Sequence, residues 1–162
     1  MGDEQDRNKD VVRTHFAALS RGDADAFADT HDPYGLNHAP APFDLSDWPP
    51  EGRPFGPAEA RETLAWLRAG SPDLQVAIED LIAEGDQVVA WIRMTGTMTG
   101  SRGPVPASGR PVDFRHAQRF RLRDGRIVEH WAVRDDLRAM IQAGVVTPPG
   151  RQWAELSENP NG

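Results

Sequence analysis

Apolar residues change their spacing once along this chain. Before residue 72 they recur every three or four positions, as Val12, Phe16 and Leu19 do, which is typical of one face of a helix. After residue 72 they alternate with polar residues, as in a strand. The pattern predicts helices over residues 10–21, 24–30 and 57–69, strands within 74–134 and a last helical turn at 137–143. This order indicates an α+β fold, with helices packed on a strongly curved antiparallel sheet that encloses a cone-shaped cavity.

Polar side chains interrupt the apolar face of the strand predicted over residues 112–122. Strand side chains alternate between two faces, so one face holds Val112, Phe114, His116, Gln118, Phe120 and Leu122. His116 and Gln118 need hydrogen-bond partners there, because an unpaired buried polar group costs about 1–3 kcal/mol. Either the protein supplies these partners, or the face lines a cavity in which a ligand supplies them.

The turn after this strand sets which residues of the next strand face it. A three-residue loop that ends in Gly125 predicts a type I turn followed by a β-bulge. In that register Gln118 lies opposite His130, and His116 lies opposite Ala132. We therefore expect one internal pocket, lined by His116, Gln118, His130, Phe114 and Phe120.

Two segments fall outside this regular pattern. Residues 39–57 contain six prolines, which disfavour regular structure, and a loop of this length commonly serves as a lid. Trp48 is an aromatic side chain with which the lid would contact a ligand, and His38 just before it is a further candidate to reach the cavity. Residues 147–162 have little apolar content and are expected to form a partly disordered tail after a single domain at 1–146.

Composition narrows the classes of function. The net charge is −7 and the basic residues are scattered, which argues against a nucleic-acid partner. Without cysteine there is no thiolate nucleophile, and the five histidines lack a paired spacing, so we expect no metal site. No apolar run approaches the roughly 18 residues of a membrane span, and the polar N-terminus does not resemble a signal peptide. We therefore expect a cytoplasmic protein.

Three segments of the chain carry a further signal, and they read VVRTHFAALSRGDADAFADTHDP, IAEGDQVVAWIRMTGTMTG and FRLRDGRIVEHWAVRDDLRAMIQAG. Together they resemble the SnoaL-like polyketide cyclases of the nuclear-transport-factor-two-like superfamily. The resemblance implies an α+β cone around a hydrophobic cavity and a homodimer that buries the outer face of the sheet. It also implies ring closure of a small hydrophobic polyketide by intramolecular aldol chemistry, without metal or cofactor.

The chain departs from this family at the residues expected to move protons. The family's acid/base aspartate aligns with Ala132, and a histidine near it aligns with Gln118. Because alanine cannot transfer a proton, the family mechanism does not carry over to this chain. His116, whose ordinary pKa is about 6.5, then becomes the first candidate for the base, and His130 the second.

Residues at the end of the last strand complete the candidate site. Asp135 is a third catalytic candidate, although it is equally well placed to cap a helix that begins at Asp136. Arg134 is a candidate for substrate binding near the cavity mouth. A further alternative is a dehydratase, in which His116 and His130 would act together with Asp29 or Asp80.

Three functions remain open. The first is a cofactor-independent cyclase, isomerase or dehydratase acting on a polyketide-like metabolite. The second is a protein that binds such a metabolite without turnover. The third is a structural dimer module, whose cavity would be filled by its own side chains.

Overall fold

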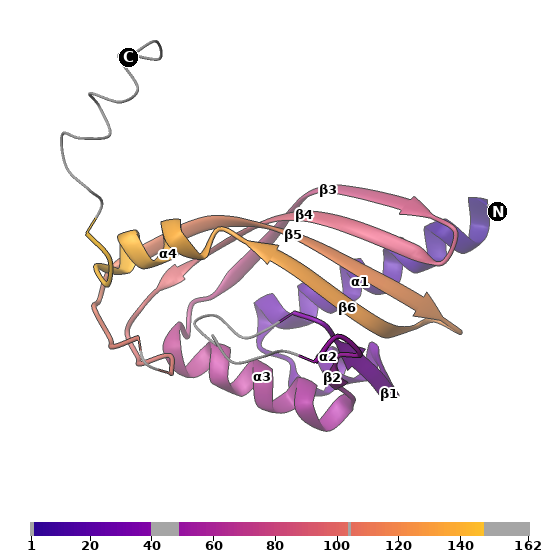
Figure 1. Ribbon diagram of the computed structural model, residues 1–162, viewed down its shortest axis with the longest axis horizontal. Helices are drawn as coiled ribbons and strands as arrows, with labels where there is room; N and C mark the ends of the chain where they lie inside the picture. Colours follow the sequence, from indigo (N-terminus) through magenta and orange to yellow (C-terminus); the bar gives the residue numbers. More distant parts are fainter. Residues whose placement is uncertain (1, 40–48, 104, 148–162) are drawn as a thin grey trace, which may run out of the picture.

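The computed structural model describes residues 2–39, 49–103 and 105–147. The four helices are α1 (Gly2–Arg21), α2 (Ala24–Asp29), α3 (Pro57–Gly70) and α4 (Asp136–Ala143). One six-stranded sheet has the order β2 (Arg53–Pro54), β1 (His31–Asn37), β6 (Arg126–Arg134), β5 (Pro111–Arg123), β4 (Gln87–Thr97), β3 (Gln75–Glu84). The α+β fold class predicted from the pattern is confirmed (Figure 1).

Short-range chemistry explains the ends of the helices. The Asp23 carboxylate accepts a hydrogen bond from the Ala26 amide at 3.0 Å, which caps α2. Pro57 begins α3, and the Glu59 carboxylate accepts from the Gly56 amide at 2.9 Å. α1 begins eight residues earlier than predicted, and its acidic first turn suits the positive end of a helix dipole. The apolar pattern missed this extension because its residues are mostly exposed.

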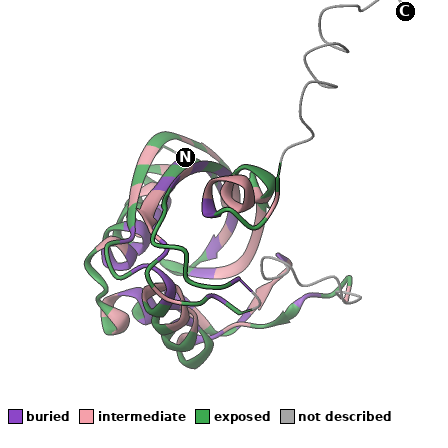
Figure 2. Ribbon diagram, turned by 90° about the vertical axis from the view of Figure 1, so that its left-hand side faces the viewer, coloured by how far each residue is buried: buried purple, intermediate pink, exposed green. Residues whose placement is uncertain are grey.

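The helices cover the concave face of the sheet. α1 crosses β3 and β4, while α2 and α3 lie on the same side, nearer β1 (Figure 1). The side chains of β4 alternate, so that Val88, Ala90, Ile92 and Met94 are buried beneath the helices. Figure 2 looks along the sheet and shows its curl, with α4 at the rim. The sheet curves strongly but remains open, because β2 and β3 form its two edges within the described residues.

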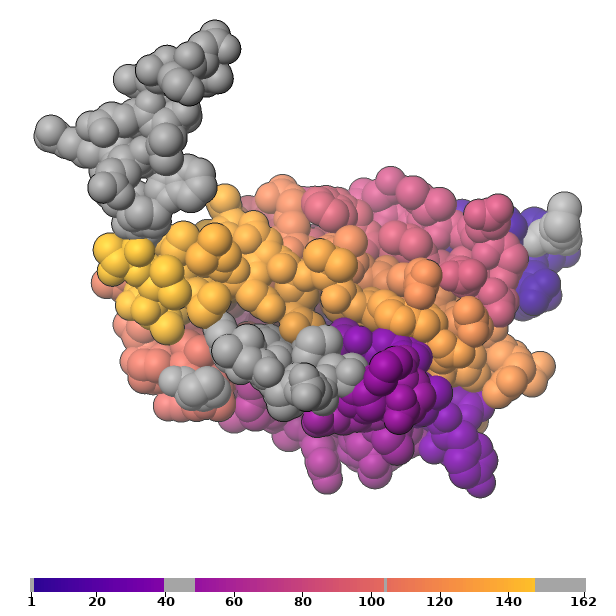
Figure 3. Space-filling view, viewed as in Figure 1, coloured from indigo at the N-terminus to yellow at the C-terminus, as the bar shows by residue number. Residues whose placement is uncertain are grey.

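β1 corrects the expectation of a wholly antiparallel sheet. It pairs in parallel with β6, so that His31 lies beside Ile127 and Asn37 beside His130. In Figure 3 this segment lies directly against β6. Pro33 cannot donate a ladder hydrogen bond, and the pairing is irregular between His31 and Leu36. Because proline is rare inside strands, the pattern of apolar and polar residues did not predict β1.

The loop predicted over residues 39–57 is partly regular. Arg53 and Pro54 form β2, which pairs with β1, so the expectation of no regular structure is wrong there. Residues 40–48, and with them Trp48, lie outside the described residues, as does the segment 148–162 of the predicted tail. In the part of the chain that the structure describes, no helix has the length and apolar character needed to cross a membrane.

The turn between β5 and β6 differs from the predicted one. It has two residues, Asp124 and Gly125, both at positive φ (51° and 73°), which is the geometry of a type I′ hairpin. A bulge follows, because Leu122 pairs with Ile127 while Arg121 pairs with Glu129. The two-residue turn and the bulge each move the register by one position.

The register therefore differs from the predicted one by two residues. Gln118 faces Ala132 instead of His130, His130 faces Phe120, and Arg119 faces Trp131 instead of Glu129. A slip of two preserves the face on which each side chain lies. His130 therefore stays on the same face as Gln118, although the predicted pairs are wrong.

Candidate functional site

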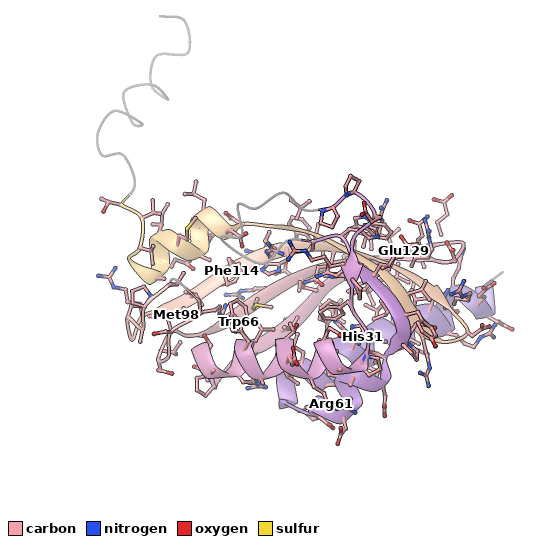
Figure 4. All side chains as sticks on the ribbon, turned by 60° about the horizontal axis from the view of Figure 1, so that its bottom comes forward. His31, Arg61, Trp66, Met98, Phe114 and Glu129 are labelled. Atoms are coloured by element: carbon pink, nitrogen blue, oxygen red, sulfur yellow. The ribbon has the colours of Figure 1, made fainter. Side chains whose placement is uncertain are left out.

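A cavity of about 600 Å³ lies between the concave face of the sheet and α3, with α4 at one end. Its wall is mostly apolar and includes Leu19, Phe27, Phe55, Trp66, Leu67, Met94, Met98, Val112, Phe114 and Met140. Figure 4 shows Trp66 of α3 and Phe114 of β5 on its two sides, whereas Arg61 points away from it. Such a wall suits a small hydrophobic ligand.

Four of the five histidines line this cavity: His15, His31, His116 and His130. Strand alternation predicted His116 and His130 at the cavity, but it did not predict His15 or His31 there. His15 lies on the apolar stripe of α1, and His31 begins β1. For His15, the only sign of a buried position in the sequence was its place on the apolar stripe of α1. No such sign marked His31, because β1 was not predicted.

His116 lies on β5 at the cavity wall and is 4% exposed. Its Nε2 is buried without a hydrogen-bond partner among the residues that the structure describes. Burial, together with the positive charges of Arg134 and Arg102, lowers the pKa of His116 to about 4. His116 is therefore neutral at pH 7.

A chain of side chains connects His116 to β1. The amide of Gln118 lies 3.5 Å from Nδ1 of His116 with one end and 3.1 Å from Nε2 of His130 with the other. Nδ1 of His130 in turn lies 3.0 Å from Oδ1 of Asn37. The parallel pairing of β1 with β6 places Asn37 beside His130 and thereby closes the chain.

The protons of this chain are fixed from its Asn37 end. The Ala39 amide donates to Asn37 Oδ1 at 2.9 Å, so that atom is an oxygen and can only accept. Nδ1 of His130 must then carry a proton. Burial lowers the pKa of His130 to about 3, so its ring holds no second proton at neutral pH and its Nε2 must accept.

The hydrogen bonds of Gln118 also determine which nitrogen of His116 carries the proton. The two ends of an amide have nearly the same shape, so the hydrogen bonds decide which end is nitrogen. The NH2 group of Gln118 must face the accepting Nε2 of His130, which turns the amide oxygen toward His116. Nδ1 of His116 therefore carries the proton, and its Nε2 keeps an unshared electron pair. The arrangement therefore gives His116, a residue of the cavity wall, a buried nitrogen with a free electron pair.

His15 and His31 share one hydroxyl group. Nδ1 of His15 lies 3.2 Å from Oγ1 of Thr30, whose hydroxyl donates to the Phe27 carbonyl at 2.7 Å. Nδ1 of His31 lies 3.0 Å from the same carbonyl. Burial lowers the pKa of His31 to about 4 and that of His15 well below its usual value. Both rings are therefore neutral at pH 7.

Charged groups gather at the end of the cavity near α4. Arg134 lines the wall and its Nε lies 3.2 Å from a carboxylate oxygen of Asp136, which also lines it. Arg102 reaches the wall from the loop after β4 and is 7% exposed. Of these three residues, only Arg134 was a candidate from the sequence.

Other sequence candidates lie away from the cavity. Phe120 packs in the core against Phe16 and His130. His38 lies on the outer face, where its ring stacks on Trp131 at 4.4 Å between centroids. Asp135 is exposed and accepts from the Arg138 amide, so it caps α4.

The carboxylates considered for a dehydratase are also elsewhere. Asp29 and Asp80 are exposed, and neither lines the cavity. Ala132 does line it, directly opposite Gln118 on β6. Among residues 2–39, 49–103 and 105–147, no three His, Cys, Asp or Glu side chains are grouped to hold a metal ion.

Comparison with known proteins places this cavity in a family context. The family model for SnoaL-like polyketide cyclases matches residues 9–143. IdmH from Streptomyces antibioticus, described as a proposed polyketide cyclase, is 28% identical, with 85% of this chain and 99% of IdmH covered at a TM-score of 0.71. A proposed SnoaL-like polyketide cyclase from Jannaschia sp. CCS1 is also 28% identical, with coverage of 89% and 95% and a TM-score of 0.72.

A third solved structure shares the fold. AclR from Streptomyces galilaeus, described as a proposed hydroxylase, is 22% identical, with 96% of this chain and 92% of AclR covered at a TM-score of 0.77. At that identity the likeness concerns the fold alone, and one fold can carry several chemistries. No curated protein matches this chain.

Proposed function

This chain belongs to the SnoaL-like polyketide cyclase family, and we propose that it catalyses cofactor-independent proton transfer on a small hydrophobic, polyketide-like metabolite. The reaction would be of the cyclase or isomerase type, with elimination of water as a further possibility of the same chemistry. The observation that carries the proposal is the buried Nε2 of His116, which has no hydrogen-bond partner in the described chain and bears an electron pair.

The lowered pKa of His116 is compatible with this role. A pKa of about 4 gives the imidazole the basicity of an ordinary aspartate. Aspartate is the acid/base residue that the resemblance to the family implies at position 132, where this chain has alanine. The ring is therefore ready to accept a proton throughout the neutral range. Unlike a carboxylate it becomes positively charged when it does so, which favours a substrate that becomes an anion in the same step.

The other residues would bind and orient. Gln118, held by His130, fixes the ring orientation and tautomer of His116 and acts as a positioning residue. Phe114 and Trp66 provide apolar walls on opposite sides of the cavity. Arg134 would contact a polar group of the ligand at the α4 end. Asp135 has no part in the proposal because it caps α4 from the outside.

The proposal is tested with a simple ketone before the natural substrate is identified. 2-Tetralone is a bicyclic ketone of suitable size with acidic hydrogens beside its carbonyl group. In D2O at pH 7 the wild-type protein is expected to accelerate the incorporation of deuterium at the carbon next to the carbonyl group. Proton NMR measures the rate of this exchange. Binding of the ketone without acceleration over buffer would favour the second candidate, a binding protein without turnover.

The third candidate, a structural module, has less support. It required a cavity filled by the protein's own side chains, whereas about 600 Å³ is open within the described residues. The binding protein remains the alternative, since the same apolar wall would hold a ligand without chemistry.

We also propose a homodimer that buries the outer face of the sheet. Trp91, Ala117 and Val133 lie side by side across β4, β5 and β6 on that face. Trp91 is 46% exposed and Val133 is 77% exposed. Neighbouring exposed apolar side chains on one sheet face are typical of a surface that binds another protein. Sedimentation at micromolar concentration is expected to give about twice the 17.9 kDa of one chain, and Val133→Arg is expected to give the single chain. Wild-type protein that sediments as one chain would contradict the dimer.

A further inference from the structure

Arg102 is a buried cation on the cavity wall. Arg102 is only 7% exposed, and its Nη2 donates a hydrogen bond to the Ser71 hydroxyl at 3.1 Å. The guanidinium carbon lies 5.5 Å from the centre of the Trp66 ring. No carboxylate pairs with it anywhere in residues 2–39, 49–103 and 105–147, and its Nε is buried there without a partner.

The backbone holds this guanidinium in place. Arg102 and Val105 exchange backbone hydrogen bonds of 2.8 and 3.0 Å, which closes a tight turn. The Gly100 amide donates to the Gly70 carbonyl at the end of α3. A Cβ atom at Gly100 would lie 1.9 Å from the Ala69 oxygen, so only glycine allows this approach. The loop is thus clamped to α3, and Arg102 is directed to the cavity before any ligand arrives.

A cation in this position is costly without an anion. A buried charge is normally paired, because removing it from water costs several kcal/mol. The Ser71 hydroxyl and the Trp66 ring offset only part of that cost, since neither carries a negative charge. Burial accordingly lowers the pKa of Arg102. The planar guanidinium fits a carboxylate through two parallel hydrogen bonds, and its Nε has no hydrogen-bond partner among the described residues.

We propose that the hydrophobic ligand of this cavity carries a carboxylate group, which Arg102 binds. This inference rests on the proposed function only in taking the cavity as the ligand site. His116 shares the same wall, so the carboxylate would orient the remainder of the ligand relative to His116 Nε2. The ligand class is then an aromatic or polycyclic acid rather than a neutral ester or amide.

Matched neutral and anionic probes test the carboxylate directly. Isothermal titration calorimetry at pH 7 compares 2-naphthoate with 2-naphthamide, which has the same shape and no charge. Wild-type protein is expected to prefer the anion by roughly 10- to 100-fold, the range of one hydrogen bond to a charged group. Arg102→Met is expected to abolish that preference. Arg126→Gln, which removes an exposed arginine at the hairpin tip, is the matched control and should keep it.

The outcomes separate this inference from the proposed function. Equal affinity for the two probes, no binding of either, or an undiminished preference in Arg102→Met overturns the carboxylate site. The wild-type comparison alone decides the matter if Arg102→Met does not fold. A lower melting temperature of Arg102→Met with an unchanged preference would assign Arg102 a structural role only. If the wild-type protein does not accelerate deuterium exchange of 2-tetralone but still prefers the anionic probe, the proposed catalysis is overturned and the carboxylate site stands.

Discussion

The protein is expected to lose most of its stability between pH 6.5 and about pH 4. Four histidines line the cavity, and burial lowers the pKa of each: to about 4 for His31 and His116, to about 3 for His130 and well below the ordinary value for His15. In the unfolded chain each would titrate near pH 6.5. The unfolded state therefore binds more protons than the folded state throughout this window.

The direction of the effect follows from proton linkage. A histidine with a lowered pKa in the folded state contributes its full stability above pH 6.5, and that contribution is lost as the pH falls toward the folded pKa. Each such group adds a slope of about 1.4 kcal/mol per pH unit, so four add up to at most about 5.6 kcal/mol per pH unit. The total stability of a domain is only about 5–15 kcal/mol.

Urea unfolding at a series of pH values from 7.5 to 4.5 measures this slope. His31→Gln removes one titrating group and is expected to reduce the slope in this window by about 1.4 kcal/mol per pH unit. Proton uptake on unfolding at pH 5.5 gives an independent count. A free energy of unfolding that stays flat from pH 6.5 to 4.5 would contradict the buried, neutral histidines.

Replacing His116 with alanine is expected to slow the deuterium exchange of 2-tetralone by about 100-fold or more. A positioned base typically contributes 10²–10⁴-fold to a rate. Neither neighbouring position can substitute for it, because Ala132 has no ionisable group and an amide such as Gln118 is a poor base. His130 is also poorly placed, since both of its ring nitrogens are engaged by Asn37 and Gln118.

Two further variants separate the roles within the site. Gln118→Leu removes the positioning contact and is expected to cost less than His116→Ala, because the base itself remains. Asp135→Asn is the matched control, since asparagine caps a helix as well as aspartate does and the residue does not line the cavity. Full exchange in His116→Ala together with loss in His130→Ala would assign the base to His130 instead.

The shared face of His116, Gln118 and His130 was predictable because strand alternation depends only on parity. A register error of two residues left the face unchanged, which is why the cluster survives an incorrect turn. One position of the error came from the two-residue turn, and the other came from the bulge at Val128, which no glycine marks. The order of helices and strands predicted the cone and its cavity, and the resemblance to the family implied the same arrangement.

Long-range placement was the part that the sequence did not reveal. His31 and Asn37 reach the site through β1, whose parallel pairing depends on a partner about 90 residues away. Arg102 lies in a loop, where no periodicity tells whether a side chain points inward. His38 was assigned to the cavity for the same reason, and it lies against Trp131 on the outer face instead. The lowered pKa of His116 depends on burial and on Arg102 and Arg134, all set by the tertiary fold.

Nitrogen-15 NMR of the imidazole rings at pH 7 tests the central claim most directly. Long-range proton–nitrogen correlations report which ring nitrogen of each histidine carries the proton. For His116 we expect a protonated Nδ1 and an unprotonated Nε2, with the same tautomer in His130, as the chain from Asn37 through Gln118 requires. Gln118→Leu is expected to leave His116 as a mixture of tautomers. A proton on Nε2 of His116 in the wild-type protein, or on both of its nitrogens, would contradict the presence of a basic nitrogen at the cavity wall.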